Sequence, residues 1–317
     1  MLRRLMRRIG LASGLLITAG AVMLACGSAS GPSNGFPAGD AGGGGSDSAG
    51  GGNVDGFGSF TDGSPTFPDG GSPTQEAGTP VALIYAHSAD TLYRLDANSK
   101  QVAVVGPFTG GCSSIIDIAI DSSSNAYVTT ETDLWKVDLQ TAACTNIASG
   151  SYPNSLSFVP KGTLDPNVEA LVGYNGSTYI RINTTTGAVQ NVGTLSGGYT
   201  SSGDIVSVIG GGTFLTVKGG KGNCDDCLLQ IDPKTGDLVQ SYGSVNHVDV
   251  FGLAFWAGTA YGFDNGGDVF SINVQNGTLV TTPIAVPNPP PGLQFWGAGS
   301  TTAAPPTAAD GGGIPIQ

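Results

Sequence analysis

The chain has 317 residues, of which 39 % are hydrophobic and 11 % charged, and it contains 52 Gly and two His. It is therefore long and apolar enough to bury a core, but it carries few of the side chains that most hydrolases need. Its formal net charge is −12, and no Lys or Arg occurs between Arg8 and Arg94. An acidic surface repels nucleic acid and anionic lipid headgroups, which excludes nucleic-acid binding.

The first predicted element is an export signal at residues 1–25. Its basic start is followed by an apolar run, Ile9 to Ala25, which is short and glycine-interrupted for a membrane span and fits a cleaved signal peptide. The segment Met23-Leu24-Ala25-Cys26-Gly27 resembles a bacterial lipobox. That resemblance implies cleavage before Cys26 and acylation of its thiol. The alternative is an ordinary signal peptide in which this cysteine has no such role.

A lipid anchor would hold the protein firmly on a membrane, because every buried methylene contributes about 0.8 kcal/mol. Gly27 stands where an Asp would favour retention in the inner membrane, so we expect an outer-membrane lipoprotein of a Gram-negative-type envelope, facing the periplasm or the cell surface. Residues 26–79 are rich in Gly, Ser, Pro and Asp and predict a disordered linker. Residues 303–317 predict a disordered tail for the same reason.

Residues 80–302 contain an internal repeat in which an apolar-polar-apolar segment precedes an Asp or Asn. The five residues at this position, spaced 41 to 49 apart, are Asp96, Asp138, Asn183, Asp232 and Asn273. A period near 45 with two-residue alternation is typical of a propeller blade of four strands. We expect these five side chains to accept hydrogen bonds from backbone amides two residues on. The glycines four residues later should adopt a positive φ; they are Gly187, Gly236 and Gly277.

Two further strands are predicted upstream of each turn, for example at residues 118–120 and 126–128, or 253–255 and 260–262. The first repeat lacks its innermost strand. Residues 292–296 (GLQFW) closely repeat residues 252–256 (GLAFW), so we expect a C-terminal strand to complete the first blade. The predicted fold is all-β, a five-bladed β-propeller closed by that strand.

The pattern Leu-x-x-Ile-Asp-x-x-Thr-Gly in residues 80–302 resembles the bacterial propellers built from YVTN, NHL and quinoprotein-like repeats. The resemblance implies a fold and not a reaction. Eight-bladed quinone enzymes need a far longer chain, so no quinone is expected. No other cofactor is predicted, and a Ca²⁺ ion is the one ligand that the acidic residues could hold.

Four cysteines remain beyond Cys26, an even number that predicts two disulfides in an oxidising compartment. A local bridge would join Cys224 to Cys227 and leave Cys112 for Cys144. A redox motif or a zinc site at the CDDC segment is the alternative, but no thioredoxin-like context and few histidines accompany it. The two histidines are interpreted as polar loop residues, because no Gly-x-Ser-x-Gly motif accompanies them; they are His87 and His247.

Acidic residues gather on one face of the predicted ring. The loops between the second and third strands of each blade emerge there, and two acids begin inner strands at the mouth of the central channel. Carboxylate oxygens suit Ca²⁺, and the candidate ligands are Asp117, Asp204, Asp249, Asp264 and Asp268. The simpler interpretation is a set of solvated turns.

The leading functional hypothesis is a monomeric, non-catalytic outer-membrane lipoprotein whose propeller binds a protein or a glycan. The alternative is a Ca²⁺-dependent hydrolase or lactonase that uses Asp117, Asp204 and Asp249 to hold the ion. A third hypothesis, a glycoside hydrolase, requires two carboxylates about 5 to 9.5 Å apart, a distance that a sequence does not supply.

Overall fold

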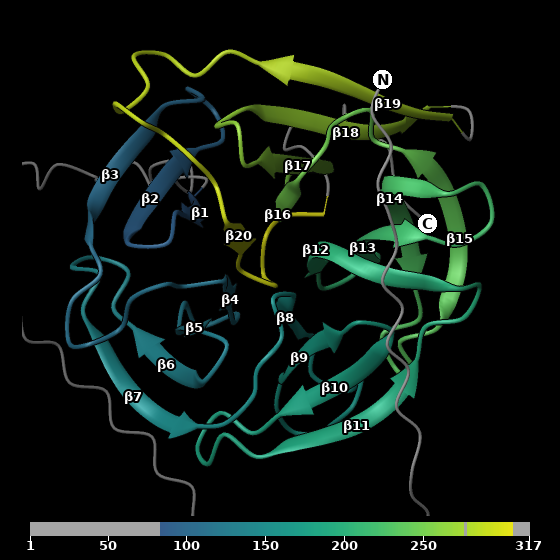
Figure 1. The fold of residues 1–317 in the computed structure, drawn as a ribbon, viewed down its shortest axis with the longest axis horizontal. Helices are drawn as coiled ribbons and strands as arrows, with labels where there is room; N and C mark the ends of the chain where they lie inside the picture. Colours follow the sequence, from purple (N-terminus) through teal and green to yellow (C-terminus); the bar gives the residue numbers. More distant parts are fainter. Residues whose placement is uncertain (1–82, 276–277, 307–317) are drawn as a thin grey trace, which may run out of the picture. The chain divides into compact units, whose positions relative to one another are not determined.

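The computed structural model describes residues 83–275 and 278–306, and every regular element in these two ranges is a β-strand. The predicted signal peptide, Cys26 and the linker lie outside the described residues. Twenty strands form five antiparallel sheets of four strands, arranged like blades around a central axis (Figure 1). The described residues include no helix that could cross a membrane.

In each blade the first strand named is the innermost and the last is the outermost. The blades are β20 (Gly297–Ser300), β1 (Leu83–His87), β2 (Thr91–Asp96) and β3 (Val102–Pro107) in blade 1; β4 (Asp117–Ile120), β5 (Ala126–Thr129), β6 (Asp133–Val137) and β7 (Cys144–Ser149) in blade 2; β8 (Leu156–Val159), β9 (Ala170–Asn175), β10 (Thr178–Ile182) and β11 (Val189–Thr194) in blade 3; β12 (Tyr199–Ser207), β13 (Thr213–Gly219), β14 (Cys224–Ile231) and β15 (Leu238–Ser244) in blade 4; β16 (Val250–Trp256), β17 (Thr259–Asp264), β18 (Val269–Gln275) and β19 (Thr278–Ile284) in blade 5.

The predicted five-bladed fold and its closure by a C-terminal strand are confirmed, because β20 pairs with β1 in the same sheet. The location of that strand was predicted wrongly. Residues 292–296 precede the strand, and β20 begins five positions later, at Gly297. Inner strands converge on the axis, where a Cβ atom at Gly297 would collide with His87 Nε2, so the large side chains of the GLQFW segment do not fit there.

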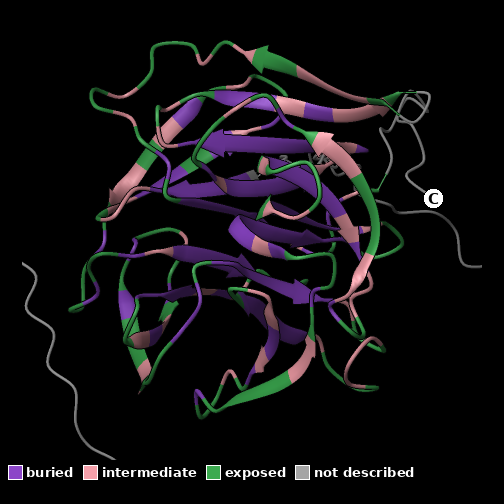
Figure 2. Ribbon diagram, turned by 45° about the vertical axis from the view of Figure 1, so that its right-hand side comes forward, coloured by how far each residue is buried: buried purple, intermediate pink, exposed green. Residues whose placement is uncertain are grey.

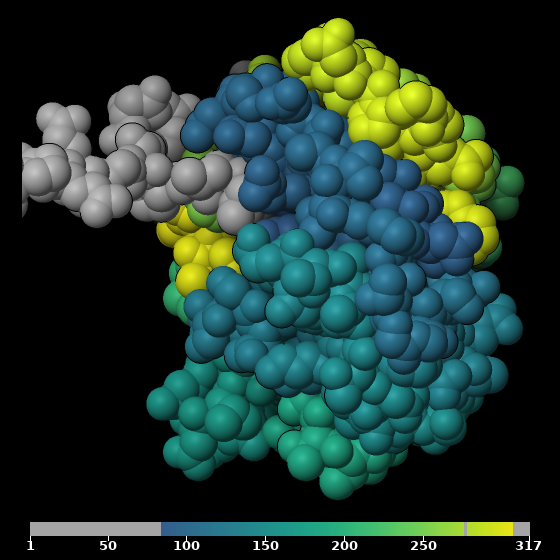
Figure 3. All heavy atoms as spheres, turned by 90° about the vertical axis from the view of Figure 1, so that its left-hand side faces the viewer, coloured from purple at the N-terminus to yellow at the C-terminus, as the bar shows by residue number. Residues whose placement is uncertain are grey.

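The core lies between neighbouring blades. Residues of the inner strands are almost all buried, whereas each outermost strand exposes much of one face (Figure 2). The apolar clusters combine two sheets, as where Ile84 of blade 1 packs in one cluster with Phe263 of blade 5. Residues of the C-terminal segment, yellow in Figure 3, lie beside the blue residues of blade 1 on the outer surface. The ring is therefore held together by side chains from adjacent repeats.

Four of the five repeated Asp and Asn residues form the predicted turns. Asp138 Oδ1, for example, accepts hydrogen bonds from the backbone N–H groups of Gln140 and Thr141 at 2.8 and 2.9 Å. Gly187 and Gly236 each have a φ of 69°, as expected. The fifth differs, because Asn273 lies within β18 and pairs with Val280, so this hairpin extends further than in the other blades. Gly277 lies outside the described residues.

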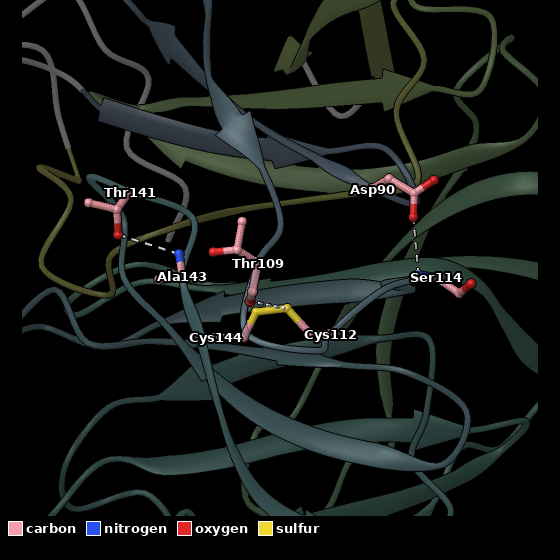
Figure 4. Close-up of a disulfide and its surroundings, with 7 residues drawn as sticks. All are labelled: Asp90, Thr109, Cys112, Ser114, Thr141, Ala143 and Cys144. Carbon is pink, nitrogen blue, oxygen red and sulfur yellow. Dashed lines mark hydrogen bonds between the residues drawn. A yellow bond between two sulfur atoms is a disulfide. The ribbon is translucent and has the colours of Figure 1, made fainter.

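Both predicted disulfides are present. Cys224 and Cys227 lie at the start of β14, and Cys112 of the loop after β3 is joined to Cys144 of β7 (Figure 4). The second bridge crosses from blade 1 to blade 2. The backbone N–H of Cys144 also donates to the carbonyl oxygen of Thr109 at 2.9 Å, so the two blades are linked by a covalent bond and a hydrogen bond side by side.

Removing the bridge between the blades with Cys112→Ser and Cys144→Ser is expected to lower the free energy of unfolding by about 4 kcal/mol. The cysteines are 32 residues apart, and closing a long loop removes much entropy from the unfolded chain. The matched control, Cys224→Ser with Cys227→Ser, opens a separation of 3 residues and should cost about 2 kcal/mol. Urea unfolding measures both, and equal losses would contradict the expectation.

Candidate functional site

The candidate site is a hollow of about 220 Å³ at the mouth of the central channel. Four of its lining residues lie within two residues of the start of an inner strand, each in a different blade, and the fifth follows β17. They are Ile116, Asn154, Phe251, Trp296 and Asn265. We call these five residues the rim. It forms on the face where the inner strands begin, which is also the face of the turns between the second and third strands of each blade.

The rim side chains are positioned by the backbone of the blades. The N–H of Trp296 donates to the carbonyl oxygen of His87 at 2.7 Å, and the N–H of Asn265 donates to that of Asp249 at 3.1 Å. In blade 4 the equivalent position is Gly203, where a Cβ atom would collide with the carbonyl oxygen of Val250. The rim is therefore open on that side.

Two rim residues stand out chemically. Trp296 is 37 % exposed, which is unusual for so large an apolar side chain. Asn265 Oδ1 is buried and has no hydrogen-bond partner, although such an unpaired acceptor costs about 1–3 kcal/mol. An exposed indole beside an unpaired acceptor is characteristic of a surface that gains from a ligand.

One residue after Ile116, Asn154, Gly203, Phe251 and Trp296, the chain forms a buried layer that we call the floor. Its members, one from each blade, are Asp117, Ser155, Asp204, Gly252 and Gly297. The structure brings the carboxyl groups of the two acids together. Asp204 accepts hydrogen bonds from the N–H groups of Ile205 and Leu253 at 2.6 and 2.7 Å, so its carboxylate ties blade 4 to blade 5.

The two carboxyl groups differ in how tightly each holds a proton. Burial, reinforced by the neighbouring Asp204 carboxylate, raises the pKa of Asp117 well above its usual range. Burial also raises the pKa of Asp204, but backbone N–H groups of Leu253 and Ile205 oppose that rise. Asp117 is therefore the member of the pair that holds its proton more tightly, and Asp204 is the one that ionises first.

His87, interpreted from the sequence as a loop residue, is instead the last residue of β1 and fully buried beside the floor. Its Nδ1 lies 2.9 Å from the carbonyl oxygen of Ser88, so Nδ1 carries the hydrogen and donates it to that oxygen. Nε2 is therefore the unprotonated ring nitrogen. Nε2 has no hydrogen-bond partner. Burial lowers the pKa of His87 to about 4, so the ring is neutral at neutral pH.

Acidification is expected to destabilise the wild-type chain relative to His87→Gln by about 3 kcal/mol between pH 6.5 and pH 4. The unfolded chain binds a proton near pH 6.5, whereas folded His87 binds it only near pH 4, so lowering the pH through this interval favours unfolding. Both chains should carry Asp117→Asn to remove the neighbouring titration. Parallel stability curves from urea unfolding at each pH would contradict the assignment.

The other predicted calcium ligands lie apart from the floor. Asp264 Oδ1 accepts hydrogen bonds from the N–H groups of Gly266 and Asp268, both at 3.0 Å, so this carboxylate forms a turn. Its Oδ2 lies 3.3 Å from Nδ1 of His247, whose ring stacks on Phe270. Within the described ranges, no three His, Cys, Asp or Glu side chains are placed to hold one ion. The five predicted ligands, Asp249 included, therefore do not form one site.

The sequence analysis did not identify the rim. Its members differ in chemistry from blade to blade, so no repeated motif marks them, and Trp296 was assigned to a strand. The available signal was positional: once the inner strands are aligned on Asp117 and Asp204, the residue before each strand faces the channel mouth. That alignment requires the register of β20, which the sequence repeat misplaced.

The fold and this channel mouth define the chain as a five-bladed β-propeller protein. No protein-family model matches it, and no curated protein matches it. Similar solved structures include the hydrazine synthase of Kuenenia stuttgartiensis (13 % identity, TM-score 0.38, covering 68 % of this chain and 65 % of that one) and a protein of unknown function from Bacteroides caccae (10 %, 0.36, 64 % and 73 %). A nidogen/laminin complex also matches (11 %, 0.44, 69 % and 97 %). The chain thus spans less than two thirds of the hydrazine synthase chain.

Proposed function

We propose that this chain is an outer-membrane lipoprotein whose propeller, with blades of the YVTN and NHL type, is a non-catalytic module for binding a protein or a glycan. The observation that carries the proposal is the rim, which contributes an exposed indole and an amide with an unpaired oxygen to the channel mouth of a closed ring. Rigid concave sites with a few polar groups among apolar ones are typical of ligand recognition. The alternative metal-dependent hydrolase has no comparable support, since within the described ranges no third His, Cys, Asp or Glu side chain joins Asp117 and Asp204 in a group that could hold an ion.

The membrane anchor in this proposal rests on the lipobox-like segment that ends at Cys26. We expect the mature chain to begin at an acylated Cys26 and to sediment with outer membranes. Mass spectrometry of the mature N-terminus tests this directly. A Cys26→Ser chain should lose the acyl mass and the membrane association, and a chain that keeps both would overturn the anchor but not the binding site.

The binding site can be tested by photocrosslinking in whole cells. A p-benzoylphenylalanine placed at Phe251 keeps an aromatic ring on the rim, and the matched control places it at Val239 of β15, which is 57 % exposed. We expect a discrete adduct from position 251 only, lost when Trp296→Ala is added. The adduct's mass distinguishes a protein from a glycan. Identical products from both positions, or none from position 251, would refute the site.

A further inference from the structure

We infer that the rim takes a primary ammonium group at the end of an alkyl stem, the side chain of a lysine presented by a partner protein. This inference rests on the proposed binding function and specifies its ligand. Three independent features of the described residues lead to it: the size and walls of the hollow, the unpaired acceptor on it, and the charge of the face around it.

The hollow has the size of one side chain. Its volume of about 220 Å³ is below the roughly 300–1,000 Å³ of pockets for drug-sized ligands. The walls are apolar, formed by Ile116, Phe251 and Trp296. The four methylenes of lysine pack well along such walls, and an ammonium group is attracted to the face of an indole ring.

One residue that lines the hollow has an acceptor with no partner among the described residues. Asn265 Oδ1 is buried and unpaired, so it lacks the hydrogen bond that nearly all buried oxygens make. An ammonium group has three N–H donors and no acceptor. A turn of the Asn265 carboxamide toward the hollow would let the ammonium group satisfy this oxygen while its other hydrogens remain available to Asn154 or to water. A quaternary ammonium has no such hydrogen, and an anion would face the oxygen with a like partial charge.

The face around the rim is acidic. The turns and strand ends on that face carry eight acids in the described ranges; they are Asp90, Glu131, Asp133, Asp225, Asp226, Asp249, Asp264 and Asp268. On the same face, the hairpin between β13 and β14 contributes Lys218 and Lys221. Directly beneath the rim, the floor adds the buried carboxyl groups of Asp117 and Asp204. Such a field concentrates cations at the channel mouth and disfavours acidic sugars or phosphates.

The test uses the full chain labelled with 5-fluorotryptophan and one-dimensional ¹⁹F NMR. The chain has three tryptophans, Trp135, Trp256 and Trp296, and only the last lies on the rim, so the other two signals are internal controls. Each signal is assigned with a Trp→Phe variant. The probe is Nα-acetyl-lysine methylamide, and its matched control is the same compound acetylated on Nε, which has nearly the same shape but no charge.

We expect the lysine probe to shift the Trp296 signal alone, saturably, and the acetylated probe to leave it unchanged. Asn265→Leu should weaken the probe's affinity about tenfold, and Asn265→Asp should strengthen it because it adds a charge beside the ammonium. The affinity should also fall as salt is raised, since the acidic face is screened. If Asn265→Leu does not fold, the affinity of Asn265→Asp for the lysine probe still tests the inference.

Several results would overturn the inference. A shift with the acetylated probe equal to that with lysine, a response of all three tryptophans, or no response to lysine would each do so. A Trp296 shift produced by a methyl glycoside but not by lysine would replace lysine with a sugar and leave the proposed binding function intact. If neither probe shifts the Trp296 signal and position 251 gives no crosslink, the proposed binding function is refuted as well.

Discussion

Asp204→Asn is expected to lower the free energy of unfolding by about 3–5 kcal/mol, whereas Asp117→Asn should change it by less than about 1 kcal/mol. The Asp204 carboxylate accepts N–H groups on both oxygens, at 2.6 Å from Ile205 and 2.7 Å from Leu253. An amide has one acceptor and would direct its NH₂ group at one of these donors. Asp117 holds its proton more tightly than Asp204 does, and a neutral amide resembles its protonated form.

The difference between Asp117 and Asp204 should also appear in how the free energy of unfolding changes with pH. Burial raises the pKa of Asp117, so the folded chain retains a proton that the unfolded chain releases near pH 4. Raising the pH from 4 to 7 therefore lowers the stability of the wild-type chain relative to Asp117→Asn. The substitution also removes the effect of the Asp117 carboxyl group on the pKa of Asp204, so the difference between the chains reports the titration of the pair. Urea unfolding at several pH values measures it, and equal losses for the two Asn variants would contradict the proton assignment.

A chain that ends at Trp296 is expected to lose its cooperative unfolding transition, whereas one that ends at Pro306 should keep it. The first truncation removes β20 and exposes the edge of β1. It also removes hydrogen bonds to other blades, including Ser300 Oγ with Phe255 N at 2.9 Å and the Thr302 carbonyl oxygen with Ile209 N, also at 2.9 Å. Ring closure and blade packing are lost together.

Thermal melting followed by circular dichroism, with size-exclusion chromatography, distinguishes the two truncated chains. The chain ending at Pro306 is the matched control, because it removes only residues beyond those that the structure describes. Aggregation of the shorter chain through its free edge is an expected accompaniment. A sharp melt of the shorter chain near that of the control would show that closure contributes little to stability.

The repeat predicted the architecture because each blade must turn at the same place. Asp138 and Asn183 form that turn with hydrogen bonds local to the sequence, so their spacing measures the blade directly. The inner strand carries no such local signal. Its residues are selected by how closely blades approach at the axis, a condition that Gly297 meets and Trp296 does not. The GLQFW segment (residues 292–296) is therefore similar in sequence to the GLAFW segment (residues 252–256) but occupies a different position in its blade.

The floor was predicted in part for the same reason. Asp117 and Asp204 could be placed at the channel mouth by counting from the turns, but their mutual contact depends on blades two repeats apart. Nothing in the sequence indicated that His87 would be buried, since its burial follows from the pairing of β1 with β20. Disulfide pairing was predictable because Cys224 and Cys227 are too close in sequence to find other partners easily.

The hydrogen bond from Trp296 N–H to the carbonyl oxygen of His87 joins the two ends of the folded region at the rim itself. The proposed binding surface is therefore the last part of the ring to be completed during synthesis. If the proposed binding function holds, fragments that lack the C-terminal segment cannot compete with the finished ring for a ligand, however many blades they have built. Affinity for such a ligand would then report directly on whether a chain has finished folding.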